Sequence, residues 1–220
     1  MTEYIFFDLD GTLTDPSEGI TNSVIYALER FGIKAPPREE LYKFIGPPLV
    51  ESFKKYYAMS EKEAQRALSV YREYFSVKGL YENAVYPGIK ELLQDLQESG
   101  FKLVLASSKP EVYVKRILEH FDLDKYFYFI GGSDLEEKRV EKPKVIDYCL
   151  ESISRPATEK CIMVGDRMHD ILGAKAHQMS SVGVLYGFGS IDELKDAGAD
   201  TICRSPEELK YFLLGLKARR

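Results

Sequence analysis

The sequence has little cysteine: Cys149, Cys161 and Cys203 are its three thiols, and their spacing fits neither a metal-binding cluster nor a disulfide scaffold. It has no excess of positive charge either, because 30 Lys and Arg residues stand against 35 Asp and Glu residues and give a net charge of -5. This balance argues against nucleic-acid binding through bulk charge. An N-terminal basic segment and long apolar stretches are also missing, so we expect no signal peptide and no membrane span. These absences predict a cytoplasmic protein whose thiols are small buried side chains.

The composition is that of an ordinary globular protein. Of 220 residues, 45% are hydrophobic and 30% are charged, which is enough to bury the core of one or two domains. No internal repeat or low-complexity segment interrupts the chain. The information therefore lies in the order of helical and extended patterns and in the polar residues between them.

Residues 15–80 carry helical patterns and almost no strand signal. Apolar side chains recur at helical spacing over residues 17–31, and Ser60 to Glu63 form a capping-box pattern at the start of a later helix. Between them, residues 44–48 contain one glycine and two prolines and form a loop. This part of the chain is therefore predicted to be an all-helical domain.

From residue 86 onward, short apolar strands alternate with helices, a pattern that implies parallel pairing through crossover connections. The sequence predicts an α/β fold, a doubly wound parallel sheet into which the helical domain is inserted. Its core domain comprises residues 1–14 and 81–220, and residues 81–87 form the returning hinge. Expected strands are 4–7, 102–106, 127–130, 161–164, 181–185 and 201–203, and expected helices are 89–98, 111–121, 144–152, 171–176, 191–197 and 206–214.

The run Asp8-Leu9-Asp10-Gly11-Thr12-Leu13 follows the first apolar strand directly. Side chains alternate along a strand, so Asp8 and Asp10 point to the same side and can enter one cleft. Crowded carboxylates repel each other, and a divalent cation with oxygen ligands removes that repulsion. One aspartate can then act as a nucleophile while the other transfers protons.

Polar residues also follow three later strands. Ligands of open α/β sheets bind outside the carboxyl ends of the strands, at the topological switch point. A metal and a lysine at such a site neutralise phosphate oxygens while a carboxylate attacks phosphorus, which is the chemistry of phosphoryl transfer. The residues expected to join Asp8 and Asp10 at this edge are Ser107, Ser108 and Lys109, then Glu141, Lys142 and Pro143, and finally Asp166 and Asp170.

These four segments, in this order and at these strand ends, resemble the haloacid dehalogenase (HAD) superfamily over essentially the whole chain. The early helical insertion resembles its helical cap, and the arrangement resembles the phosphoglycolate phosphatase-like branch. The resemblance implies that Asp8 is the nucleophile that becomes an aspartyl-phosphate and also a Mg²⁺ ligand. It implies that Asp10 is the general acid/base and binds the metal through its backbone carbonyl. Asp166 would complete the Mg²⁺ site, and Asp170 would support it.

The resemblance also assigns substrate contacts. Ser107 would hold the transferring phosphoryl group, although the adjacent Ser108 is an alternative, and Lys142 would pair with phosphate and with Asp8. Lys138, Arg139 and Lys144 compete with Lys142 but are expected to be solvated, and Asp170 could instead N-cap the following helix. Thr12 is a further expected substrate contact. In the cap loop Ile45-Gly46-Pro47-Pro48, Gly46 is a candidate contact and Lys43 is close enough to reach an anionic group, but the loop could equally be a simple connection between helices.

The function implied is a Mg²⁺-dependent phosphatase of small monoesters, such as phosphoglycolate, a sugar phosphate or a nucleoside monophosphate. An acid at Asp10 favours phosphate esters over carbon–halogen bonds. Two alternatives stay open: a sugar phosphomutase, and a catalytically idle binding or regulatory module on the same fold. The expected partner is a small phosphorylated metabolite, with neither nucleic acid nor membrane, and the protein would be a monomer or a homodimer.

Overall fold

The computed structural model describes residues 2–136 and 138–218 and divides into two compact units. The core unit comprises Met1–Thr14 and Val85–Arg220, and the helical unit comprises Asp15–Ala84. A two-stranded sheet of β2 (Thr14–Asp15) and β3 (Ala84–Val85) forms where the chain leaves the core unit and returns to it. The helical unit is therefore an insertion after the first strand of the core unit.

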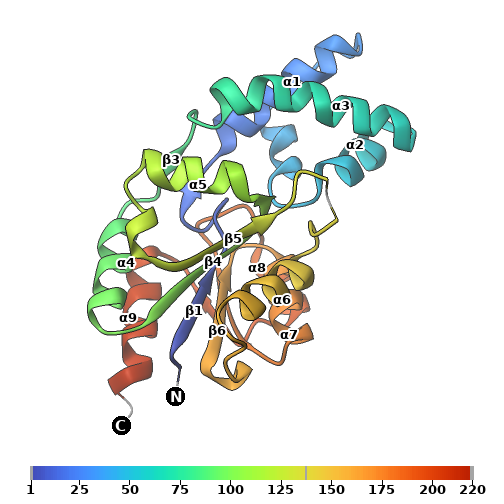
Figure 1. Cartoon of the computed structure of the whole chain (residues 1–220). Coiled ribbons are helices and arrows are strands. Elements are labelled where there is room, and N and C mark those ends of the chain that lie inside the picture. The colour runs from blue at the N-terminus through green and yellow to red at the C-terminus, as the bar shows by residue number, and fades with distance from the viewer. Residues whose placement is uncertain (1, 137, 219–220) are drawn as a thin grey trace. The chain divides into compact units, whose positions relative to one another are not determined.

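The core unit is built on a parallel sheet that contains six strands within the described residues, in the order β5-β4-β1-β6-β7-β8 (Figure 1). The chain first builds outward from β1 to β4 and β5, and then crosses to β6, β7 and β8 on the other side. This reversal beside β1 is a topological switch point. The strands are β1 (Tyr4–Phe7), β4 (Lys102–Pro110), β5 (Phe127–Ser133), β6 (Cys161–Gly165), β7 (Ser180–Val184) and β8 (Thr201–Cys203).

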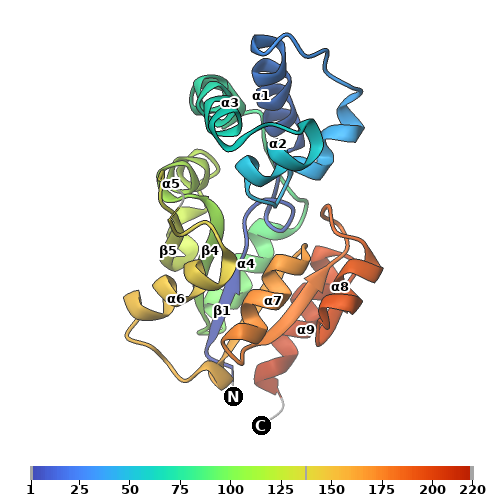
Figure 2. The ribbon, with the colours of Figure 1, turned by 90° about the vertical axis from the view of Figure 1, so that its right-hand side faces the viewer.

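Helices connect the successive strands, as parallel pairing requires. In Figure 1, α4 and α9 lie on one side of the sheet and α6, α7 and α8 on the other, and Figure 2 looks onto the second side. This arrangement confirms the predicted doubly wound α/β fold. The elements are α4 (Ile89–Glu98), α5 (Glu111–His120), η3 (Asp124–Tyr126), α6 (Lys142–Ser152), η4 (Thr158–Lys160), α7 (Met168–Ala176), α8 (Ile191–Ala197) and α9 (Pro206–Ala218).

The central strand packs against α6. Tyr4 and Phe6 of β1 belong to one cluster of buried side chains with Val145 and Ile146 of that helix. Because side chains alternate along a strand, Asp8 continues the Tyr4–Phe6 face where β1 ends. Hydrophobic packing of β1 on α6 thus directs the first aspartate toward the start of α6.

Some predicted boundaries were wrong. β4 does not end at Ala106 but continues to Pro110, where it pairs with Ser133 of β5, and β5 also extends beyond its predicted end. α6 begins at Lys142 and α7 at Met168, both earlier than predicted. Serine, glycine and proline give weak strand signals, so only pairing between neighbouring strands keeps these segments extended.

In the helical unit, α1 packs on α3, and α2 packs on α3 as well. The predicted capping box at Ser60 and Glu63 is confirmed, because each side chain accepts the backbone N–H of the other residue. Of the predicted loop at residues 44–48, residues 45–48 are non-helical, but Phe44 is the last residue of a 3₁₀ helix, η1 (Arg38–Phe44), and α2 was not predicted. The elements are α1 (Ser17–Arg30), η1 (Arg38–Phe44), α2 (Leu49–Tyr57), α3 (Glu61–Tyr74) and η2 (Phe75–Gly79). Across residues 2–136 and 138–218, no helix is both long and apolar enough to cross a membrane.

Candidate active site

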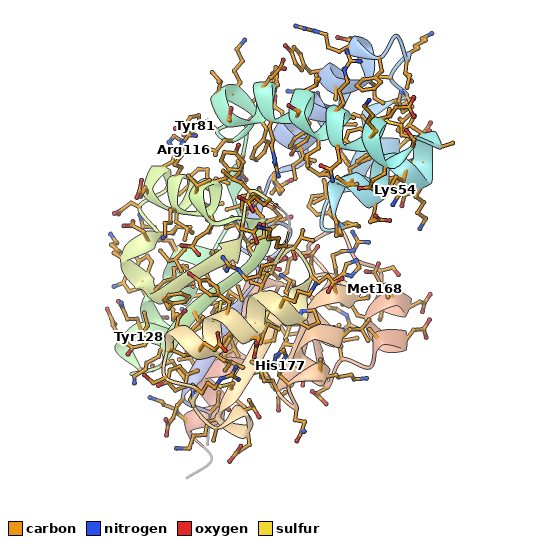
Figure 3. The ribbon with its side chains drawn as sticks, turned by 45° about the vertical axis from the view of Figure 1, so that its right-hand side comes forward. Lys54, Tyr81, Arg116, Tyr128, Met168 and His177 are labelled. Atoms are coloured by element: carbon orange, nitrogen blue, oxygen red, sulfur yellow. The ribbon has the colours of Figure 1, made fainter. Side chains whose placement is uncertain are left out.

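Three buried carboxylates meet at the carboxyl edge of the core sheet. Asp8 follows β1, Asp166 follows β6, and Asp170 lies in the first turn of α7. One oxygen of each lies within 4.8 Å of the others, and all three residues are buried. In Figure 3, the labels of Met168 and His177 mark the two ends of α7, and Asp170 belongs to the Met168 end. The sheet thus gathers these acids as the switch-point argument predicted.

Lys142, the first residue of α6, gives this cluster its positive charge. Its side chain is 2% exposed, and its Nζ lies 2.8 Å from Asp8 Oδ1 and 2.8 Å from Asp170 Oδ1. Nζ also donates to the carbonyl oxygen of Ala106 at 2.9 Å, so three acceptors surround its three protons. Burial alone would lower the pKa of Lys142, but the charges of Asp170 and Asp8 raise it above its usual value. The lysine therefore stays charged.

The carboxylates outnumber this cation. Burial, and after it the charges of Asp170 and Asp8, raise the pKa of Asp166 well above its usual value. Burial raises the pKa of Asp170 to about 6, against the lowering effect of Lys142. The cluster consequently holds too little positive charge to keep all its acids ionised at the ordinary pKa of a carboxyl group.

This donor set fits a divalent cation. Asp8 Oδ1 and Asp170 Oδ1 are buried, and apart from their ion pairs with Lys142 they have no hydrogen-bond partner among the described residues. Carboxylate oxygens are the ligands that Mg²⁺ takes in proteins. A bound dication would satisfy these oxygens and cancel the repulsion that raises the carboxyl pKa values.

Backbone and hydroxyl donors orient two of these acids. Asp166 Oδ2 accepts the N–H of Phe188 at 2.8 Å, and Asp166 Oδ1 lies 3.5 Å from the donating hydroxyl of the buried Thr12. Asp170 lies within α7, where its Oδ2 accepts the N–H of Arg167 at 3.1 Å. Asp170 is therefore not the N-cap considered from the sequence, because the helix begins before it. The substrate contact expected of Thr12 stays a prediction.

Asp10 pairs with Lys109, a residue that the sequence placed at this edge without assigning it a partner. Lys109 Nζ lies 2.7 Å from Asp10 Oδ1, and the two side chains are 7% and 12% exposed. Burial raises the pKa of Asp10 above its usual value, whereas the charge of Lys109 acts in the opposite direction. In the sequence, Lys109 was notable only because it follows two serines at the end of a strand. The structure adds that β4 lies beside β1, which lets Lys109 reach Asp10.

The two candidate phosphate-binding serines differ in burial. Ser107 is 2% exposed and its hydroxyl accepts the N–H of Lys109 at 3.3 Å, whereas Ser108 is half-buried. Ser107 was favoured because it would follow the last strand residue, and that reason is wrong since β4 continues to Pro110. Its burial beside the central strand leaves Ser107 as the preferred prediction.

The competing cations have other partners. Lys144 forms an ion pair with Glu141 at 3.0 Å, and both residues are exposed. Lys138 is exposed as well. Arg139 is not simply solvated as predicted, because its guanidinium lies 3.7 Å from the centre of the Tyr148 ring. Lys142 is thus the candidate that the structure places against the acids.

The cap-loop residues belong to the helical unit. Gly46 is half-buried and has a φ of 101°, a conformation that glycine adopts without strain. The ammonium of Lys43 lies 4.5 Å from the centre of the Tyr56 ring within the same unit. The substrate contact expected of Gly46 stays a prediction.

The sequence patterns missed the loop that follows β7. Besides the Phe188 contact to Asp166, the Tyr186 hydroxyl donates to the carbonyl oxygen of Thr12 at 3.1 Å. A Cβ atom on Gly189 would overlap the carbonyl oxygen of Asp166, so only glycine lets the backbone approach this closely. The sequence offered one indication of this loop, the two glycines within residues 187–189. This loop holds Asp166 in place from the outer side.

A parallel α/β sheet with a helical insertion and a buried carboxylate–lysine cluster at its switch point defines a phosphoryl-transfer type of site. A family model described as haloacid dehalogenase-like hydrolase matches residues 5–184. The chain belongs to this family. Several of its relatives and structural neighbours are named or described as phosphatases.

The relatives carry different functional names. The 5'-nucleotidase of Pseudomonas aeruginosa is 50% identical over 209 residues, which cover 95% of this chain and 94% of the relative. The tyrosine-protein kinase PtkA of Mycobacterium tuberculosis is 38% identical over 191 residues, 86% of this chain and 64% of the relative. The crystal structure of a predicted phosphatase from Clostridium acetobutylicum superposes with a TM-score of 0.95 at 49% identity, covering 98% of this chain and 99% of that one.

Proposed function

We propose that this chain is a Mg²⁺-dependent phosphatase of small phosphate monoesters and that the reaction passes through an aspartyl-phosphate on Asp8. The observation that carries the proposal is the buried cluster in which Lys142 contacts both Asp8 and Asp170 at 2.8 Å while Asp166 closes the acidic group. Buried charges are costly to maintain, and phosphoryl transfer gives each member a use. Asp8, Asp166 and Asp170, with the backbone carbonyl of Asp10, would hold Mg²⁺, which neutralises phosphate charge when bound.

The residues of the chain divide the reaction between them. An oxygen of Asp8 forms a bond to phosphorus as the bond from phosphorus to the ester oxygen breaks. Asp10, whose pKa burial raises, gives its proton to the departing oxygen. Asp10 then takes a proton from water, which attacks phosphorus and frees Asp8. Lys142 and the Ser107 hydroxyl hold the phosphate oxygens throughout.

The substrate class is proposed from the relatives. The 5'-nucleotidase name of the relative from Pseudomonas aeruginosa, which is 50% identical to this chain, supports a nucleoside monophosphate. A phosphomutase would share the first step and differ in the acceptor, which would be a second hydroxyl of the substrate instead of water. A kinase would differ in the donor as well, because it takes the phosphoryl group from a nucleoside triphosphate. The fate of the phosphoryl group therefore separates these activities.

The test is phosphate release with Mg²⁺ from a panel that contains nucleoside monophosphates, sugar phosphates and phosphoglycolate. Asp8→Asn removes the nucleophile, and we expect kcat to fall by at least about 10³-fold. Asp196→Asn, an exposed acid on α8, is the matched control and should keep its rate. Interconversion of sugar phosphate isomers, or transfer of labelled phosphate to a tyrosine, without release of phosphate would contradict the proposal. Binding of Mg²⁺ without any turnover would favour a binding module.

A further inference from the structure

A cavity of ≈ 330 Å³ opens in the core unit at the ends of β4 and β5. Its lining includes Pro110 and Glu111 at the junction of β4 with α5, Ser133 at the end of β5, and Tyr148 of α6. Pro110 and Ser133 are paired across the two strands. The cavity therefore lies at the carboxyl edge of the sheet, the same edge that carries the phosphoryl site.

Two polar atoms in this lining lack a hydrogen-bond partner among the described residues. Ser133 is 2% exposed and its hydroxyl is unpaired. Glu111 Oε1 forms an ion pair with Lys115 at 2.6 Å, and its buried Oε2 makes no hydrogen bond of ordinary geometry to a described residue, although burial and the nearby Glu111 carboxylate together raise the pKa of Tyr148 in the same lining. Buried polar atoms are rarely left without partners, so a hydroxyl and a carboxylate oxygen at one cavity indicate a ligand that donates hydrogen bonds.

The charged and apolar residues that line the cavity limit the kinds of ligand it can bind. Three of its lining residues are acidic and one is basic, namely Glu111, Asp134 and Glu136 against Arg139. A second anionic group would be repelled here, whereas N–H donors would be favoured. Val112 is 46% exposed and Leu135 is 49% exposed, so the same lining offers apolar side chains to a ligand. An uncharged group with an apolar face and N–H donors matches these walls.

The spacing along β4 suits a leaving group attached to the phosphoryl site. Pro110 lies three residues after Ser107 in β4, so the two residues are at most about 11 Å apart. Lys109 between them pairs with Asp10, the proposed proton donor to the leaving oxygen. A leaving group that starts at Asp10 and extends along the end of β4 would reach the cavity.

We propose that this cavity binds the nucleobase of a nucleoside 5′-monophosphate, with Glu111 and Ser133 accepting or exchanging hydrogen bonds with its amino and ring N–H groups. The inference rests on the proposed phosphatase function and adds the base-binding site to it. It also predicts a selectivity: substrates whose leaving group carries a carboxylate, such as phosphoglycolate, would meet a cavity of the wrong charge.

The experiment compares kcat/KM for cytidine, adenosine and guanosine 5′-monophosphates with kcat/KM for ribose 5-phosphate, which is the same ester without a base. In the wild type we expect the nucleotides to be favoured by about tenfold or more. Glu111→Gln and Ser133→Ala should each lower this ratio by about three- to tenfold, the loss expected for one hydrogen bond. Ser152→Ala on α6, an exposed serine, is the matched control and should keep the ratio.

A charge reversal gives a second, independent measurement. Glu111→Lys should raise kcat/KM for phosphoglycolate relative to the nucleotides, because it replaces a negative charge in the cavity lining with a positive one. Nucleotide preference that Glu111→Gln and Ser133→Ala leave intact, or a wild type that prefers ribose 5-phosphate, would overturn the base site and leave the phosphatase function standing. A wild type that releases phosphate from no ester would overturn both.

Discussion

The two units bury polar groups of different kinds. In the helical unit, the described buried polar residues are Thr21, Ser23 and Ser52, and each hydroxyl donates to a backbone carbonyl four residues earlier. In the core unit, the buried set includes charged groups: Asp8, Asp10, Lys142, Asp166 and Asp170. A buried hydroxyl bonded within its own helix costs little, whereas each buried charge costs several kcal/mol before pairing compensates it.

This difference in buried charge indicates that the core unit carries the chemical function. Packing and local hydrogen bonds account for the buried polar residues of the helical unit, so stability alone explains why they are there. The core unit keeps a net negative buried cluster that a stability argument alone does not justify. Substitutions in the two units should therefore have different signatures: those in the cluster should depend on pH and Mg²⁺, and those in the helical unit should not.

The largest effect is expected when the buried cation is removed. Lys142→Met leaves Asp8 and Asp170 without the ion pairs they form at 2.8 Å. We expect the free energy of unfolding, measured with urea without divalent cations near neutral pH, to fall by about 3–5 kcal/mol. Lys144→Met removes only an exposed pair with Glu141 and should change stability by less than about 0.5 kcal/mol. Equal stability of the two variants would show that the cluster is not held by this charge.

The second effect is a pH-dependent response to Mg²⁺. The pKa of Asp170 is raised to about 6 and that of Asp166 is raised well above its usual value. The native state therefore binds more protons than the unfolded chain above the ordinary carboxyl pKa, and metal-free stability should fall as pH rises through these raised values. Mg²⁺ competes with the same protons, so its stabilisation should be larger at about pH 8 than at about pH 5. Thermal unfolding with Mg²⁺ and with EDTA at both pH values measures this.

Asp166→Asn is the matched variant for this measurement. It removes one buried negative charge and retains an oxygen acceptor for the Phe188 N–H. Metal-free at about pH 8, the variant should be more stable than the wild type by about 1–3 kcal/mol, and it should gain little from Mg²⁺. A variant that is less stable at both pH values and still responds to Mg²⁺ would show that Asp166 has a packing role and is not part of a metal site.

Much of this cluster could be predicted because it follows from strand order. Asp8 and Asp166 sit directly after apolar strands, and parallel strands put their carboxyl ends at one edge. The contact between Lys109 and Asp10 could not be predicted, since it depends on side-chain reach between β4 and β1 after an irregular register beyond Ala106. The loop at Tyr186 to Gly189 was missed because its contacts are made by backbone atoms, which leave no charged residue in the sequence.

The helical unit shows the same division between local and tertiary signals. The capping box at Ser60 is a local pattern, and it was predicted. Helix α2 was missed because Pro47 and Pro48 precede it and its buried apolar side chains, Val50 and Phe53, are few. Packing on α3 stabilises that helix, and such packing is not visible in a short window of sequence.

A close contact between helices tests the helical unit itself. A Cβ atom on Gly19 of α1 would overlap the carbonyl oxygen of Gly79 in η2. We expect Gly19→Ala to lower the free energy of unfolding by about 1–3 kcal/mol, the cost of overpacking. Gly215→Ala on α9, where an added Cβ has no atom within 4 Å, is the control and should be neutral or slightly stabilising because alanine favours the helix. The same loss in both variants would show that the contact with Gly79 does not cause the loss at Gly19.

The smallest effect is expected at the N-terminus of α3. Ser60→Ala removes the hydroxyl that accepts the Glu63 N–H, and loss of such a cap typically costs about 1 kcal/mol. The Ser60 hydroxyl also donates to the Glu63 carboxylate and lowers the pKa of that group, which is therefore ionised both at about pH 5 and at about pH 8. The loss should consequently be the same at both pH values, with or without Mg²⁺. Urea unfolding under these four conditions measures it. A loss that varies with Mg²⁺ would show that the helical unit shares the electrostatics of the acidic cluster, and the contrast between the two units would no longer hold.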